Sequence, residues 1–211
     1  FKQSNTILLD GGMGTMLQAA GLKLGARPEE LNITDPALIE GIHAQYAAAG
    51  SRIVNANTFG ASAHKLAGSA YTLEQIITAG IENCKRACAP YGALTALDVG
   101  PLGELLEPSG TLAFEDAVAE YARIVKAGEA AGADLIFFET YTDLYELKAA
   151  LLAAKENTRL PILASMSFEA GGRTFTGCTV ESFAATARGL GADAVGINCS
   201  LGPKEIFPMA K

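Results

Sequence analysis

A short pattern that occurs three times constrains the fold of this chain more than any other feature. In each copy a helix-like segment ends at a glycine and is followed by an apolar run that polar residues close; the copies are residues 49–58, 131–140 and 190–199. A glycine after the last helical turn supplies a left-handed helix cap, and the apolar run has the length of a buried parallel strand. The pattern predicts helices that alternate with parallel strands.

Further apolar runs at residues 6–10, 94–99 and 161–167 bring the expected strands to about six. The segments between the runs carry apolar residues at three- and four-residue spacing, which is typical of helices that pack on a sheet. We expect these helices at residues 36–49, 73–89, 113–131, 144–156 and 180–190.

Two architectures, a closed barrel and a doubly wound sheet, are built from such repeats. Polar or reactive residues recur at the carboxyl ends of five expected strands: Asp10, Asn57, Asp98, Glu139 and Cys199. Barrel enzymes gather their sites from the ends of many strands, whereas doubly wound sheets usually use one crevice. We therefore expect the α/β class and a (β/α)8 TIM barrel, of which these 211 residues would form about the first six units.

The composition restricts the partners and the compartment. Hydrophobic residues make up 49% of the chain and charged residues 18%, which is enough to bury a large core. A net charge of −7 without a basic run argues against nucleic acid as a partner. No apolar run reaches the ~18 residues that a membrane span requires, and the start lacks a signal pattern, so we expect a cytoplasmic protein without a membrane partner.

Four cysteines are too few for a disulfide scaffold of this length, so we expect reduced thiols. Cys84 and Cys88 are four residues apart on an expected helix and have no further ligand nearby, which favours packing over metal binding. Cys178 could approach Cys199, but we expect it to be a loop cysteine without a functional role. The two histidines have no companions that would complete a nucleophilic triad.

Three places in the chain carry candidate binding residues, each with an alternative. The glycine-rich turn at residues 10–15 lacks the glycine spacing of a dinucleotide-binding motif. It is better suited to a tight turn whose backbone N–H groups face a carboxylate. Asp10 would then bind an ammonium or cap the turn. Glu139 ends a buried strand and needs a partner, which could be a substrate ammonium or an internal arginine. Cys199, after the sixth strand, is a core residue or a metal ligand.

Five motifs together resemble the homocysteine S-methyltransferase family in order and approximate spacing. They lie at residues 10–15, 55–61, 98–103, 138–140 and 196–203, so the resemblance covers essentially the whole chain. It is most similar to the homocysteine-binding domain at the N-terminus of bacterial cobalamin-dependent methionine synthases.

This resemblance implies a zinc site and a substrate pocket. In the family, a cysteine after the sixth strand and a Cys-Cys pair near the eighth hold zinc, whose fourth position takes the homocysteine sulfur. Cys199 matches the first ligand, and the pair has no counterpart in these 211 residues. By the same resemblance Asp10 and Glu139 hold the substrate ammonium. The remaining implied residues are Gly12, Met13, Gly14 and Thr15 for the substrate carboxylate and Asn57 and Asn198 for support of the pocket.

The resemblance further implies methyl transfer to the homocysteine thiolate, which forms methionine. The donor would be methylcobalamin or methyltetrahydrofolate, bound by folate- and cobalamin-binding domains of the same protein. We expect residues 1–211 to be one homocysteine-binding domain, incomplete at its carboxyl end and inactive alone. Two alternatives remain, a metal-free barrel of aldolase or pterin-binding type and a non-catalytic fragment.

Overall fold

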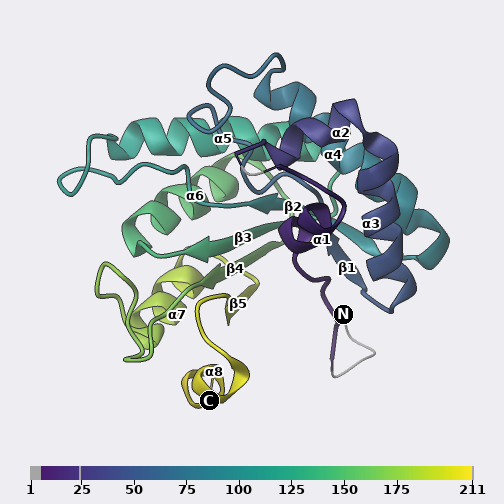
Figure 1. The fold of residues 1–211 in the computed structure, drawn as a ribbon. Helices are drawn as coiled ribbons and strands as arrows, with labels where there is room; N and C mark the ends of the chain where they lie inside the picture. The colour runs from purple at the N-terminus through teal and green to yellow at the C-terminus, as the bar shows by residue number, and fades with distance from the viewer. Residues whose placement is uncertain (1–5, 24, 211) are drawn as a thin grey trace. The chain divides into compact units, whose positions relative to one another are not determined.

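The computed structural model describes residues 6–23 and 25–210 and resolves the chain into two compact units. The first unit comprises Phe1–Asp98 and Ala127–Leu135, and the second comprises Val99–Lys126 and Ile136–Lys211. Figure 1 shows the helices and strands of both units along the chain.

In the first unit, strand β1 (Ile53–Asn55) pairs in parallel with β2 (Leu94–Val99). Ile53 lies opposite Leu94, and Asn55 lies opposite Ala96. The helices of this unit are α1 (Met13–Ala19), α2 (Leu31–Thr34), α3 (Pro36–Ala48) and α4 (Leu73–Cys88), with the 3-10 turns η1 (Pro28–Glu30) and η2 (Ala89–Tyr91). Helices α3 and α4 pack together, and the short α2 contacts both (Figure 1).

In the second unit, three parallel strands lie in chain order. These are β3 (Leu135–Tyr141), β4 (Ile162–Met166) and β5 (Ala194–Ile197), with Phe137 opposite Leu163 and Ala164 opposite Val195. The accompanying helices are α6 (Leu144–Asn157), α7 (Val180–Gly189) and α8 (Pro203–Met209), while α5 (Phe114–Ala130) runs from the second unit into the first. Helix α6 packs against α7, and α7 contacts β5.

All five expected helices form, with ends within one or two residues of the expected ones. Five of the six expected strands form as well, but the run at residues 6–10 is reduced to a single parallel bridge between Leu9 and Ile53. Leu8 and Leu9 are 56% and 38% exposed, so this run lacks the burial on both faces that holds a central parallel strand. The first strand of the sequence-based prediction is therefore wrong in length.

Two copies of the repeated pattern begin a strand with the same ring of hydrogen bonds. The backbone N–H of Asp134 donates to the carbonyl of Thr95 at 2.9 Å, and the N–H of Thr95 donates to Asp134 Oδ2 at 2.8 Å. Asp193 and Ile162 form the same ring with distances of 2.8 and 2.9 Å. The first copy has Arg52 at this position; its backbone N–H donates to the carbonyl of Leu8 at 2.8 Å, and its carbonyl accepts from the N–H of Leu94 at 2.9 Å.

A buried carboxylate in the second unit holds the loop at residues 99–103. Glu146, only 4% exposed, accepts from the backbone N–H of Leu102 at 2.7 Å and from the Tyr121 hydroxyl at 2.9 Å. Burial, then the neighbouring Tyr141 and Glu146, raise the pKa of Tyr121 well above its usual value. Tyr121 is therefore a neutral donor, and the loop motif is structurally fixed.

Over residues 6–23 and 25–210, no helix combines the length and the apolar character needed to cross a membrane.

Candidate functional site

Three of the residues proposed from the sequence come together in the second unit. Glu139 lies near the end of β3, and Asn198 and Cys199 directly follow β5. Together with Thr140 and Ser165 they form a set that we call the Asn198 cluster, because the Asn198 side chain contacts every other member.

The hydrogen bonds of the Asn198 cluster can be assigned a direction from chemistry alone. The backbone N–H of Thr140 can only donate, so the atom 3.1 Å from it is the Asn198 amide oxygen. The Ser165 hydroxyl donates to the same oxygen at 2.8 Å. The Asn198 nitrogen has two hydrogens and three acceptors within reach: Glu139 Oε2 at 2.8 Å and Thr140 Oγ1 at 2.7 Å are the nearer ones, and Cys199 Sγ lies 3.4 Å away. The Thr140 hydroxyl hydrogen is then free to donate to the Cys199 sulfur at 3.6 Å.

The backbone at this site adopts an unusual conformation at three residues. Thr140 has a φ of 65°, and the pairing of β3 with β4 shifts register between Phe138 and Tyr141. Cys199 and Ser200 follow β5 with φ values of 59° and 60°. Left-handed conformations are uncommon for residues other than glycine and rarest for β-branched ones. Bulges of this kind redirect side chains next to active sites. The bulge therefore turns Glu139 and Thr140 toward Asn198.

Two serines of the site were not singled out from the sequence. Ser165 bonds the side chain of Asn198, and the Ser167 hydroxyl donates to the Asn198 carbonyl at 2.9 Å. Their spacing of two residues at the end of an apolar run was a usable signal, because alternate residues of a strand lie on one face. Thr140 was visible beside Glu139, but its left-handed backbone was not.

The glycine-rich turn lies in the first unit. Asp10 Oδ2 accepts from the backbone N–H of Asn55 at 2.9 Å, at the end of β1. The Tyr46 hydroxyl donates to the carbonyl of Gly12 at 3.3 Å, and a Cβ at Gly11 would lie 3.0 Å from the Tyr46 ring. Burial, followed by the charge of Asp10, raises the pKa of Tyr46. A side chain at position 11 would therefore have to displace the Tyr46 ring by a few tenths of an ångström.

Gly12 caps helix α1, and Met13, Gly14 and Thr15 form its first turn. No side chain caps this helix end, and its first turn contains no acidic residue. Gly12, Gly14 and Thr15 are exposed, while Met13 packs partly against the core.

Asn57 belongs to a buried set of first-unit residues, Asn32, Asn57 and Asn83, which we call the asparagine network. The Asn57 amide nitrogen donates to the Pro28 carbonyl at 2.8 Å and to Asn32 Oδ1 at 3.0 Å. Asn32 donates to the Asn57 carbonyl at 2.8 Å, and Asn83 donates to the Asn32 carbonyl at 2.9 Å. Both amide hydrogens of Asn57 are thus engaged within the unit, where they hold the loop around Pro28.

The cysteines differ sharply in environment. Cys199 is exposed, whereas Cys84 and Cys88 are buried on α4 with their sulfurs 3.8 Å apart. The contact with Cys88, together with burial, raises the pKa of Cys84. Cys178 donates to the Thr179 carbonyl at 3.2 Å, and burial raises its pKa. Two thiols thus pack in the core, as expected.

The described residues do not by themselves fit a zinc ion. Within residues 6–23 and 25–210, no group of three or more His, Cys, Asp or Glu side chains could hold a metal. Structural and catalytic zinc sites use three or four protein ligands, and the Asn198 cluster offers the single thiol of Cys199.

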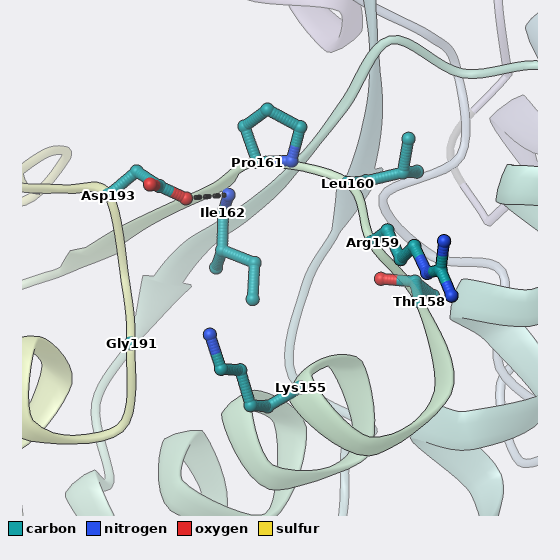
Figure 2. A pocket seen from close by; sticks show the side chains of 8 residues that line it. All are labelled: Lys155, Thr158, Arg159, Leu160, Pro161, Ile162, Gly191 and Asp193. Atoms are coloured by element: carbon teal, nitrogen blue, oxygen red, sulfur yellow. Dashed lines mark hydrogen bonds between the residues drawn. The ribbon is translucent and has the colours of Figure 1, made fainter.

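The second unit also contains a cavity of about 340 Å³ at the amino-terminal starts of β4 and β5 (Figure 2). Figure 2 shows Lys155 reaching into the space near Gly191, and Asp193 bonded to the backbone of Ile162. None of the residues that line the cavity was proposed from the sequence as a site residue. Active sites of parallel α/β proteins lie at the opposite ends of the strands, where the Asn198 cluster is found.

Comparison with known proteins links these features to a family. Residues 7–211 match the family model described as homocysteine S-methyltransferase. Methionine synthase of Mycobacterium tuberculosis is 31% identical over 217 residues, and that of Mycobacterium leprae is 32% identical over 219 residues. Both matches cover 93% of this chain and 18% of the relative, so the chain spans about a fifth of the length of these relatives.

Solved structures show the same fold. The metallated form of the homocysteine methyltransferase MmuM from Escherichia coli matches with a TM-score of 0.85 and 23% identity, over 97% of this chain and 77% of that one. The apo form matches with a TM-score of 0.74 and 22% identity, over 97% and 75%. The α/β class and the partial barrel expected from the sequence are thereby confirmed.

Proposed function

The chain belongs to the homocysteine S-methyltransferase family, and from this premise we propose that residues 1–211 form a homocysteine-binding domain that serves methyl transfer to the substrate sulfur. The observation that carries the proposal is the Asn198 cluster, which joins a carboxylate and a thiol through one amide. Homocysteine carries an ammonium, a carboxylate and a thiol, so a site for it needs a negative group at one end and sulfur chemistry at the other.

We assign Glu139 and Asp10 to the substrate ammonium. A carboxylate that accepts a hydrogen bond from an amide keeps further lone pairs for an ammonium, and charged hydrogen bonds are the stronger ones. Backbone N–H groups of Gly12, Met13, Gly14 and Thr15 would receive the substrate carboxylate. The N-terminal turn of α1, free of acidic residues, supports this assignment. Asn57 and Asn198 support the pocket from within the protein.

We further propose that Cys199 is one ligand of a zinc ion whose other ligands are not among the described residues. Its exposed thiol, reached by the Thr140 hydroxyl, is the supporting observation. Methylcobalamin or methyltetrahydrofolate is the proposed donor, bound by further domains. The greater length of the methionine synthase relatives supports such domains. We also propose that the protein is cytoplasmic.

Calorimetric titration with homocysteine and with its des-amino analogue 4-mercaptobutyrate tests the ammonium assignment. Glu139→Gln and Asp10→Asn should each weaken homocysteine binding about tenfold to a hundredfold and leave the analogue nearly unaffected. Glu156→Gln, at an exposed carboxylate on α6, is the matched control and should change neither affinity. Equal losses for the two ligands would show that the carboxylates are structural.

Metal analysis of the intact protein tests the ligand assignment. Cys199→Ala should lose zinc, whereas Cys84→Ala, Cys88→Ala and Cys178→Ala should retain it, because two of these thiols are buried in packing and the third bonds its own loop. Zinc retained in Cys199→Ala would refute the role of this residue.

A further inference from the structure

Thr140 contacts the Asn198 amide at two points. Its backbone N–H donates to Asn198 Oδ1 at 3.1 Å, and its hydroxyl accepts from Asn198 Nδ2 at 2.7 Å. Two parallel hydrogen bonds from one residue fix the plane of the amide as well as its position. Ser165 adds a third restraint at the amide oxygen, at 2.8 Å.

This double contact depends on the backbone of Thr140. A φ of 65° is costly for a β-branched residue, and such strain persists only where surrounding contacts impose it. The register shift between Phe138 and Tyr141 places the strained residue at the point where β3 meets Asn198. The conformation aims the N–H and the hydroxyl of Thr140 at the two ends of one amide.

The fixed amide in turn fixes the carboxylate. With one Asn198 hydrogen on Thr140 Oγ1, the other is directed to Glu139 Oε2 at 2.8 Å, because the alternative acceptor, the Cys199 sulfur, lies farther away at 3.4 Å. We propose that Thr140 is a positioning residue, which orients the Glu139 carboxylate toward the substrate ammonium by clamping Asn198. This inference rests on the proposed function, and Thr140 itself need not touch the substrate.

Two substitutions separate the hydroxyl from the shape of the side chain. Thr140→Val keeps the branched side chain and removes the hydroxyl, whereas Thr140→Ser keeps the hydroxyl. By calorimetry on the intact protein, Thr140→Val should weaken homocysteine about tenfold and 4-mercaptobutyrate less than about twofold, and Thr140→Ser should stay within about threefold of wild type for both. Equal effects of the two substitutions, or equal losses for both ligands, would overturn the proposal.

A double-mutant cycle tests whether Thr140 acts through Glu139. In a Glu139→Gln background, adding Thr140→Val should cause less than about a twofold further loss of homocysteine affinity, because the carboxylate that Thr140 positions is already gone. A further tenfold loss would show an independent role and contradict the proposal.

Two controls keep the outcomes separate. If circular dichroism shows that Thr140→Val does not fold, Ser165→Ala takes its place, because it removes another hydrogen bond to the same amide. It should lower the affinity for homocysteine relative to that for 4-mercaptobutyrate. An unchanged ratio of the two affinities would overturn the proposal. Failure of the wild-type protein to bind homocysteine refutes the proposed function and this inference with it. Binding that Thr140→Val leaves intact refutes the inference alone.

Discussion

Each of the two units has an asparagine after the end of a strand, and the two asparagines differ in burial and in their hydrogen-bond partners. Asn57, after β1, is 5% exposed and bonds a backbone carbonyl and another asparagine. Asn198, after β5, is only half-buried and bonds a carboxylate and two hydroxyls, with the Cys199 sulfur 3.4 Å from its nitrogen. The same residue type at the same point of the repeat thus closes the fold in one unit and arranges reactive groups in the other. Burial and partner chemistry decide between the two roles.

The largest stability difference should appear between Asn32→Ala and Asn198→Ala. Removing the 2% exposed Asn32 side chain leaves buried donors and acceptors of Asn57 and Ile76 without these partners, at a cost of about 3 kcal/mol in the free energy of unfolding. Asn198→Ala should cost about 1 kcal/mol, because Asn198 is only half-buried and water can replace part of its hydrogen bonds. Urea denaturation measures both, and similar losses would remove the distinction between the units.

His43 gives the first unit a pH dependence of stability. Its side chain is fully buried on α3, and within the described residues neither ring nitrogen has a hydrogen-bond partner. Burial lowers its pKa from 6.5 to about 4. As the pH falls, the His43 imidazole therefore takes up a proton more readily in the unfolded chain than in the folded one. The stability that depends on a neutral His43 is complete above pH 6.5 and is lost toward pH 4. The loss amounts to about 3 kcal/mol.

The measurement compares wild type with His43→Leu by urea denaturation at several values between pH 6.5 and pH 4. The leucine variant should show a smaller fall in unfolding free energy across this window. Parallel curves for the two proteins would mean that His43 is protonated in the folded state at ordinary acidic pH.

The smallest difference concerns the helix caps. Thr72 at the start of α4 forms a reciprocal capping box with Gln75. The Thr179 hydroxyl at the start of α7 accepts from the N–H of Ser182 and donates to Ser182 Oγ, so Ser182 stands where a capping box has Glu or Gln. Thr72→Ala should therefore cost about 1 kcal/mol and Thr179→Ala about half of that. Thermal unfolding of both variants gives the ranking, and a larger loss at Thr179 would contradict it.

The sequence was sufficient for the longer elements because they carry strong periodicity and clear caps. Helix α4 was expected at residues 73–89 and occupies Leu73–Cys88, and the β2 range of 94–99 matches in full. The seven-residue α1 and four-residue α2 are too short for a periodic signal. The residues 6–10 were apolar enough for a strand, but their exposure depends on tertiary packing that no local pattern encodes.

For the candidate site, the sequence indicated which residues end the strands but not how they bond. Glu139 and Asn198 were both expected at carboxyl ends, and their contact follows from parallel pairing. The contact of Thr140 with Asn198 depends on a bulge and a positive φ at residue 140. The sequence has no glycine there that would have indicated such a backbone conformation. The hydrogen bonds among these side chains therefore depend on the tertiary structure and not on the local sequence.

The carboxylate rings at the strand starts also bear on how faithfully the chain folds. Asp134 with Thr95, and Asp193 with Ile162, each bond through both an N–H and a carbonyl of one partner residue. Sliding one strand by a single residue would move the partner by ~3.3 Å, break both bonds and turn every side chain to the opposite face. Parallel strands joined by long crossovers pair slowly and can meet out of alignment. Each ring closes in one alignment only, so a misaligned strand lacks both of its bonds and separates more readily than the correctly aligned one.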